Sequence, residues 1–146
     1  MAEGISMAEY VLALDQGTTS CRSILFSQDG SIVAVAQQEL EQILPFPGHV
    51  EHDANQIWDS QLATAREVLH TSGAELSDVK AIGITNQRET TVIWDRQTGQ
   101  PVQNAIVWQS RITSDLCKEI ESQGYTDLIQ QKTGLLLDAY FSASKI

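Results

Sequence analysis

Basic residues and cysteines are both scarce in this sequence of 146 residues. Nine lysine and arginine residues stand against 19 aspartate and glutamate residues, which gives a net charge of −10. A surface this acidic repels a phosphate backbone, so the composition argues against nucleic-acid binding. A small anion can still bind where positive groups are concentrated, which makes the position of each arginine informative.

The sequence also lacks the long apolar runs of membrane and secreted proteins. No run approaches the roughly 20 residues that cross a bilayer. Residues 1–9 have neither the basic start nor the apolar stretch of a secretory signal, and we expect them to be a flexible N-terminus. Cys21 and Cys117 fit no metal-ligand spacing. We therefore expect two free, buried thiols in a reducing cytoplasm, with one disulfide as the alternative.

Short apolar segments alternate with helical patterns, which predicts an α/β domain with a mixed sheet. The Asp29-Gly30 pair is a hairpin turn signal that makes the neighbouring strands antiparallel. We expect the first strand to be buried on both faces. The predicted strands are residues 10–15, 23–27, 31–37, 80–85, 90–95 and 105–108. The predicted later helices are residues 113–123, ended by Gly124, and 127–132.

A longer helix is expected from about Ala54 to the Ser72-Gly73 stop signal. Asp53 and Gln56 have the spacing of a capping box at its start. Four residues step by four, three and four positions, which predicts a stripe that faces the core. These residues are Trp58, Leu62, Ala65 and Leu69.

A loop rich in hydroxyl groups follows the first predicted strand. Asp15 ends that strand, where its carboxylate can hold Mg²⁺ directly or through water. Gly17 lets the backbone pass close to an anion, and the next N–H and hydroxyl groups can surround phosphate oxygens. These groups belong to Thr18, Thr19 and Ser20, with Arg22 adding positive charge. The alternative is a polar hairpin turn whose aspartate bonds its own loop.

A second cluster of polar residues, at positions 86–89, separates two of the predicted strands. The carboxylate of Glu89 can accept hydrogen bonds from hydroxyl groups and Arg88 can donate to them, which suits a small polyol. Trp108 and Tyr140 would add an aromatic wall and a phenol hydroxyl to such a pocket. From composition alone the alternatives are a solvated ion pair and, for the two aromatic residues, core packing.

Four motifs, taken in order and with their intervals, resemble the FGGY carbohydrate kinases. They are residues 13–20 (ALDQGTTS), 47–53 (PGHVEHD), 83–91 (GITNQRETT) and 104–109 (NAIVWQ). The resemblance runs from about Tyr10 to the end of the chain. It implies the ribonuclease H-like fold of the actin and Hsp70 ATPases, with residues 10–146 as part of the N-terminal kinase domain.

Within this family the motifs are similar to those of members that phosphorylate glycerol with ATP and Mg²⁺ to give sn-glycerol 3-phosphate. The resemblance then implies a metal-organising role for Asp15 and a contact between Arg22 and the phosphates of ADP. It assigns the nucleotide phosphate loop to Thr18, Thr19 and Ser20. It assigns the glycerol contacts to Arg88, Glu89, Trp108 and Tyr140.

The chain is shorter than the two-domain members of this family. The family has two domains with a cleft between them, and the residues that resemble its catalytic base and adenine pocket lie in later sequence. The chain ends at Ile146 without a stop signal, so we expect it to be incomplete and inactive alone. Another FGGY sugar kinase, a non-catalytic fragment and an incomplete gene model remain alternatives. A homo-oligomer of the full-length form also remains open.

Overall fold

The computed structural model describes residues 9–146, which form two compact units. Unit 1 runs to Leu40 and continues over Asn55–Asn86, whereas unit 2 comprises Glu41–Ala54 and Gln87–Ile146. Of the expected flexible N-terminus, residues 1–8 lie outside the described residues.

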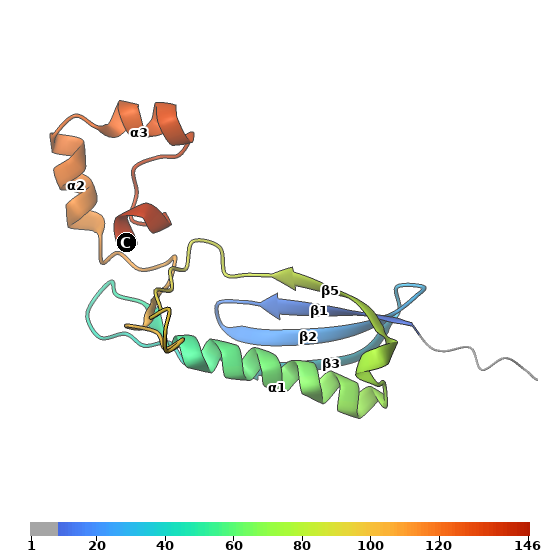
Figure 1. Cartoon of the computed structure of the whole chain (residues 1–146). Helices are drawn as coiled ribbons and strands as arrows, with labels where there is room; N and C mark the ends of the chain where they lie inside the picture. Colours follow the sequence, from blue (N-terminus) through green and yellow to red (C-terminus); the bar gives the residue numbers. More distant parts are fainter. Residues whose placement is uncertain (1–8) are drawn as a thin grey trace, which may run out of the picture. The chain divides into compact units, whose positions relative to one another are not determined.

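Unit 1 contains a four-stranded mixed sheet in the order β3-β2-β1-β5 (Figure 1). The strand β1 pairs with β2 antiparallel and with β5 parallel, and β2 pairs with β3 antiparallel. The prediction of an α/β unit with a mixed sheet is therefore confirmed. The bounds are β1 (Tyr10–Gln16), β2 (Ser20–Ser27), β3 (Ile32–Glu39), β5 (Val79–Thr85), the helix α1 (Ala54–Ser72) and a 3₁₀ turn (Leu76–Asp78).

The core of unit 1 lies between one face of this sheet and α1. Leu12 of β1 and Leu25 of β2 are opposite each other in the antiparallel register, and both are buried. Ala36 of β3 and Val68 of α1 complete the buried cluster. Burying each large aliphatic side chain contributes about 1.5–3 kcal/mol, so this small core holds the helix on the sheet.

The helix α1 has the predicted bounds, and Ala65 and Leu69 of the predicted stripe pack against the core. Trp58, predicted to face the core, is 66% exposed, so that part of the prediction is wrong. The fully buried positions are Ser60, Thr64 and Val68. The Ser23 and Thr64 hydroxyl oxygens lie 2.9 Å apart in a buried hydrogen bond. Hydropathy does not reveal this face, because a buried hydroxyl needs a partner from another element.

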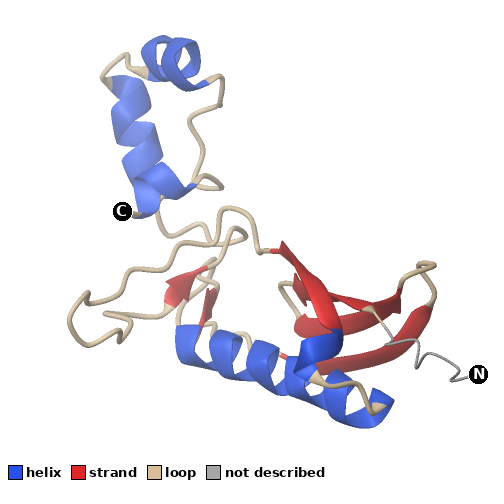
Figure 2. Ribbon diagram, turned by 45° about the vertical axis from the view of Figure 1, so that its right-hand side comes forward, coloured by secondary structure: helices blue, strands red, loops and turns tan. Residues whose placement is uncertain are grey.

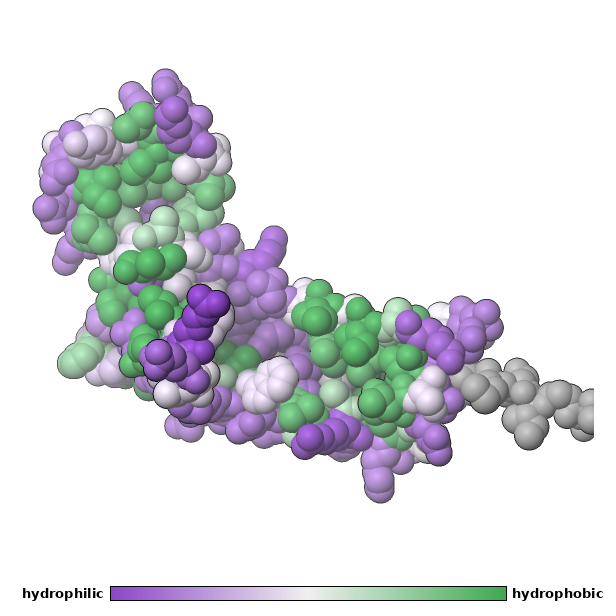
Figure 3. Space-filling view, in the orientation of Figure 1, coloured by the Kyte–Doolittle hydropathy of each residue, from purple (hydrophilic) through white to green (hydrophobic). Residues whose placement is uncertain are grey.

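Within unit 1, none of the described elements covers the other face of the sheet. Val11, which neighbours the buried Leu12 in β1, is 42% exposed, so the expectation of a strand buried on both faces is wrong. Ile84 on the edge strand β5 is 75% exposed. Figure 3 shows apolar side chains gathered on this part of unit 1.

Unit 2 has little sheet and consists mainly of loops and short helices (Figure 2). Residues 90–95 do not form the predicted strand, since only isolated bridges occur at Thr91 and Trp94. The Asp95 carboxylate accepts hydrogen bonds from two backbone N–H groups, and this turn ends the extended segment. The elements are β4 (Glu51–His52), β6 (Ala105–Ile106), α2 (Ser114–Ser122), α3 (Thr126–Thr133) and a 3₁₀ turn (Ser142–Lys145).

The two short helices confirm the sequence prediction closely. The helix α2 is followed by Gly124 with φ of 81°, and α3 by Gly134 with φ of 74°. These left-handed conformations suit glycine and end helices in the usual way. The predicted strand 105–108 is shorter than expected, because its antiparallel partner β4 is only two residues long.

Candidate functional site

The hydroxyl-rich loop is a tight turn between β1 and β2. The Gly17 N–H donates to the Ser20 carbonyl oxygen over 3.0 Å. A Cβ atom on Gly17 would lie 2.8 Å from that oxygen, so the turn requires glycine here. The Leu40 N–H donates to the Thr19 carbonyl oxygen over 2.9 Å and holds the tip of the loop. The loop is therefore a fixed feature of unit 1, with Thr18 and Thr19 at its turn.

Asp15 and Arg22 are directly opposite each other on β1 and β2. The Arg22 guanidinium donates to the Asp15 carboxylate, with Nη2 and Nε at 2.5 and 3.2 Å from Oδ2. The two side chains are 31% and 45% exposed for Asp15 and Arg22 respectively. A partly exposed pair of this kind contributes about 0–1 kcal/mol, so a ligand can replace either partner at little cost. The sheet thus places an anion-binding and a cation-binding group beside the loop.

A metal ion bound at Asp15 would need oxygen atoms from a bound phosphate compound as well as from the protein. No cluster of three or more His, Cys, Asp and Glu side chains suitable for a metal occurs within residues 9–146. Mg²⁺ is commonly held by one or two carboxylates together with water and substrate phosphates. Asp15 therefore fits a site for a magnesium–nucleotide complex, and does not fit a closed protein cage.

The thiol next to this loop is packed and unreactive in character. Cys21 is fully buried and free, and the Gln16 side-chain amide donates to its sulfur over 3.2 Å. Burial raises the pKa of the Cys21 thiol, although hydrogen bonds from Ser60 and Gln16 act in the opposite direction. Cys117 is also buried and free, so the expectation of two free thiols is confirmed.

In unit 2, Glu89 occupies a left-handed backbone conformation with φ of 63°. For a residue with a Cβ this conformation costs about 1–2 kcal/mol, so surrounding contacts must hold it. The Ser142 hydroxyl and backbone N–H lie 3.1 and 3.3 Å from the Glu89 Oε2 atom, and both donate to it. The Lys145 ammonium donates to the Glu89 carbonyl oxygen over 2.7 Å. Residues from the end of the chain therefore fix both the backbone and the carboxylate of Glu89.

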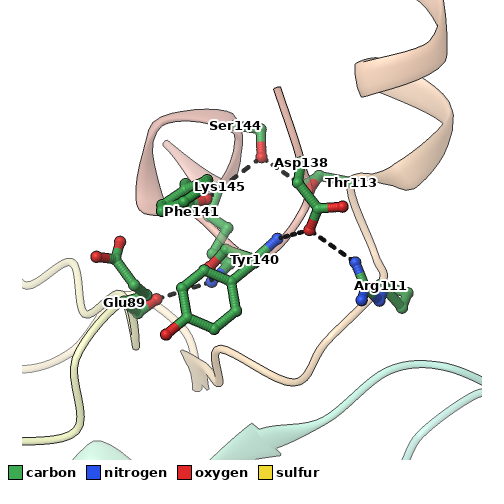
Figure 4. Close-up of polar contacts among 8 residues, drawn as sticks. All are labelled: Glu89, Arg111, Thr113, Asp138, Tyr140, Phe141, Ser144 and Lys145. Atoms are coloured by element: carbon green, nitrogen blue, oxygen red, sulfur yellow. Dashed lines mark hydrogen bonds and ion pairs between the residues drawn. The ribbon is translucent and has the colours of Figure 1, made fainter. Parts of the chain in front are cut away.

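Tyr140 is fixed by the same segment (Figure 4). The Lys145 ammonium donates to the Tyr140 carbonyl oxygen over 2.8 Å. The Tyr140 N–H donates to Asp138 Oδ1 over 2.7 Å, and Arg111 donates to the same oxygen over 2.8 Å. The hydrogen bond from the Tyr140 backbone lowers the pKa of Asp138, and Arg111 acts in the same direction against the effect of burial. The Tyr140 ring meets Trp108 edge to face at 5.7 Å between centroids.

A buried histidine supports the turn that carries Glu89. His52 on β4 is fully buried, and its Nδ1 atom lies 3.3 Å from the Gln87 side-chain nitrogen. The Gln87 side-chain oxygen accepts a hydrogen bond from the Thr90 hydroxyl over 3.0 Å. Burial lowers the pKa of His52, and the bond to Gln87 opposes this in part. The neutral ring therefore anchors the turn at residues 87–90.

Three of the four residues expected to contact a polyol lie together in unit 2. Glu89 and Tyr140 share the Lys145 ammonium, and Trp108 touches the ring of Tyr140. Arg88 precedes Glu89 in the same turn, and its side chain is exposed. The residues of the hydroxyl-rich loop belong to unit 1. The arrangement in unit 2 brings the main chains of Glu89 and Tyr140 together at one ammonium group and places the Tyr140 ring against Trp108.

Sequence reasoning missed the residues that hold this arrangement together. Asp138 lies two positions before Tyr140, a spacing typical of an Asx turn, and this signal was available. Ser142 and Lys145 gave no comparable signal, because serine and lysine side chains usually lie in solvent. Lys145 is only 6% exposed, and its partner carbonyl is 56 residues away in sequence.

The comparisons with known proteins agree on one family. A model of the FGGY family of carbohydrate kinases, N-terminal domain, matches residues 10–146. A protein of Janthinobacterium sp. named glycerol kinase is 61% identical over 140 residues. The match covers 96% of this chain and 28% of that protein. A Treponema denticola protein of the same name is 59% identical over 140 residues, with the same coverage. The chain therefore spans 28% of the length of these curated relatives.

Solved structures give the same result. The crystal structure of Plasmodium falciparum glycerol kinase with ADP is similar with a TM-score of 0.84 and 36% identity, covering 94% of this chain and 28% of that one. A gluconate kinase from Lactobacillus acidophilus is similar in fold, with a TM-score of 0.86 at 20% identity, covering 94% and 27%. Among residues 9–146, no helix has the length and apolar character needed to cross a membrane.

Proposed function

Because this chain belongs to the FGGY family of carbohydrate kinases, we propose that it forms part of an enzyme that phosphorylates glycerol with ATP to give sn-glycerol 3-phosphate. The observation that carries the proposal is the grouping of Glu89, Tyr140 and Trp108 in unit 2. The relatives at about 60% identity that bear the name glycerol kinase support the choice of glycerol.

In this proposal unit 2 recognises glycerol. Glycerol has little surface to bury, so its hydroxyl groups must provide most of the recognition. The Glu89 carboxylate accepts from hydroxyl groups, and Arg88 donates to them from the adjacent position. The aromatic side chains of Trp108 and Tyr140 pack against the C–H groups of the substrate. An analogue that lacks a hydroxyl leaves these polar groups unpaired and binds poorly.

Unit 1 binds the nucleotide in the same proposal. The hydroxyl groups of Thr18, Thr19 and Ser20 lie at the turn after β1, where they can meet phosphate oxygens. Arg22 supplies a guanidinium for a phosphate, in exchange for its contact with Asp15. Phosphoryl transfer depends mainly on positioning and charge stabilisation, which these groups provide.

The proposal includes Mg²⁺ held by Asp15 together with water and phosphate oxygens. When bound, the ion would neutralise charge on the phosphates during transfer. Release of Arg22 to the nucleotide leaves the Asp15 carboxylate available for this cation. The free Cys21 and Cys117 support a reducing, cytoplasmic setting for the enzyme.

The chain matches only 28% of its relatives, so the test needs the remaining part. We suggest a chimaera in which residues 10–146 replace the matching segment of the Janthinobacterium glycerol kinase. The expected result is glycerol-dependent release of ADP by the chimaera and none by the chain of 146 residues alone. The intact Janthinobacterium enzyme serves as the control for the assay.

Two other results would change the proposal. A folded chimaera without turnover on any polyol would support a non-catalytic role for this segment and contradict the proposal. A chimaera that phosphorylates a pentulose in preference to glycerol would favour another sugar kinase of the same family. Glycerol turnover by the 146-residue chain alone would contradict the view that the unmatched part of the relatives supplies necessary groups.

A further inference from the structure

Lys145 is an unusual residue for the place that it occupies. It is 6% exposed, whereas lysine is almost never this buried unless its ammonium has partners. Burial of an ammonium is costly, and the cost is offset only by hydrogen bonds of good geometry. A packing role alone would be met by an apolar side chain of similar length. The presence of a buried charge therefore points to its particular partners.

The partners of Lys145 are the two residues that the proposed function assigns to glycerol. Its ammonium donates to the carbonyl oxygens of Glu89 and Tyr140 at 2.7 and 2.8 Å (Figure 4). These two residues are 51 positions apart, and the ammonium connects their main chains. Burial lowers the pKa of Lys145, while the carboxylates of Glu89 and Asp138 act in the opposite direction.

Ser142 acts on the same glutamate from the same turn. Its hydroxyl donates to Glu89 Oε2 over 3.1 Å, and its backbone N–H lies 3.3 Å from that oxygen. Glu89 has a backbone conformation with φ of 63°, which relaxes readily when its contacts are removed. The 3₁₀ turn at Ser142–Lys145 therefore fixes the place and direction of the Glu89 carboxylate.

We propose that Lys145 and Ser142 are positioning residues of the glycerol site, which hold the Glu89 carboxylate and the Tyr140 loop in the arrangement that binds glycerol. This inference rests on the proposed function. Neither residue contacts the substrate in the proposal, and each acts through Glu89 or Tyr140. A displacement of about 1 Å in a binding group is enough to weaken substrate binding and turnover strongly.

The test uses the chimaera described above with Lys145→Met, which keeps the length of the side chain and removes its charge. The matched control is Lys118→Met, because Lys118 is exposed on α2, where it forms a surface ion pair with Asp115. We expect the KM for glycerol to rise about tenfold or more in Lys145→Met. The KM for ATP should stay at the parent value, and Lys118→Met should match the parent in both constants.

A purely structural role predicts a different pattern. It would lower the melting temperature and the amount of folded enzyme, while both KM values of the folded fraction stay unchanged. That result would overturn the inference while leaving the proposed function intact. A parent chimaera without glycerol turnover would overturn the proposed function, and this inference with it.

A second variant decides the matter if Lys145→Met yields no folded enzyme. Ser142→Ala removes the hydroxyl donor to Glu89 and leaves the buried lysine in place. The expected rise in the KM for glycerol is about two- to tenfold, with the KM for ATP unchanged. Ser122→Ala on α2 is its control, since that exposed hydroxyl donates to the carbonyl oxygen of Glu119 in its own helix. A KM for glycerol equal to the parent in folded Ser142→Ala would overturn the inference.

Discussion

The two units of this chain position their chemical groups by different means. In unit 1, Asp15 and Arg22 are seven residues apart and meet because a hairpin register places them opposite each other. In unit 2, Glu89 is held by Ser142 and Lys145, which are 53 and 56 residues away. Local register is readable from sequence, whereas contacts between distant loops are not. The difference also suggests that nucleotide and glycerol binding can be altered separately by mutation.

The largest effect is expected from a change in unit 1. In the chimaera, Asp15→Asn removes the charge that would hold Mg²⁺ and keeps the shape of the side chain. We expect kcat to fall about a hundredfold or more, with little change in the KM for glycerol. Steady-state kinetics at saturating Mg²⁺ and ATP would measure both constants.

The control for this change is Asp29→Asn. Asp29 lies in the exposed hairpin turn, where its carboxylate accepts hydrogen bonds from Ser27 and Ser31. The same chemical change there should leave kcat close to the parent value. An unchanged kcat in Asp15→Asn would contradict the role proposed for this carboxylate.

A smaller effect of a different kind is expected in unit 2. Glu89→Ala removes the acceptor for glycerol hydroxyl groups, and a hydrogen bond to a charged group is worth about 1.5–3 kcal/mol. The KM for glycerol should therefore rise about tenfold to a hundredfold, and well beyond the KM for ATP. Kinetics at saturating ATP would measure the rise, with Glu121→Ala on the exposed face of α2 as the control.

The alternative of a solvated surface charge predicts almost no change for Glu89→Ala, since such pairs contribute about 0–1 kcal/mol. A KM for glycerol equal to the parent would thus remove Glu89 from the binding site. A rise in the KM for a pentulose with none for glycerol would favour a different sugar as the substrate.

The smallest effect concerns the pH dependence of stability. Burial holds the pKa of His52 below its ordinary value of 6.5, so the unfolded chain takes up the proton first on acidification. The contribution of His52 to the free energy of unfolding is therefore complete above about pH 6.5. It is lost as the pH falls below that value, by up to about 1.4 kcal/mol per pH unit. Thermal unfolding of the chimaera between pH 7.5 and 5.5 would show this loss.

His52→Gln should remove that acid-dependent component, because an amide does not titrate. His70→Gln is the matched control, since His70 is exposed near the end of α1 and should leave the loss in place. Equal losses on acidification in the parent and in His52→Gln would show that the buried ring is not the group responsible.

Much of unit 1 could be predicted from the sequence because its signals are local. The Asp29-Gly30 turn fixes the β2–β3 hairpin, and the Ser72-Gly73 stop ends α1 at the expected residue. The burial of Thr64 on α1 could not be predicted, since it depends on a hydroxyl partner in β2. Hydropathy assigns such a residue to solvent.

The candidate site shows the same division. The turn after β1 and Asp15 follow from a strand end and a glycine, and the residues proposed to contact a polyol stand in recognisable sequence motifs. The residues that fix Glu89 and Tyr140 could not be predicted, because the burial of Lys145 depends on the main-chain carbonyl groups of these two residues. No pattern in the sequence records a lysine that bonds to the backbone of a distant loop.

Direct binding of glycerol to the chimaera tests most sharply whether the two units carry separate tasks. Isothermal titration calorimetry without nucleotide would compare the parent with Asp15→Asn and Glu89→Ala. We predict that Asp15→Asn binds glycerol with the parent Kd, while Glu89→Ala binds it about tenfold to a hundredfold more weakly. Equal weakening in both variants, or parent-like binding in Glu89→Ala, would contradict the assignment of glycerol to unit 2.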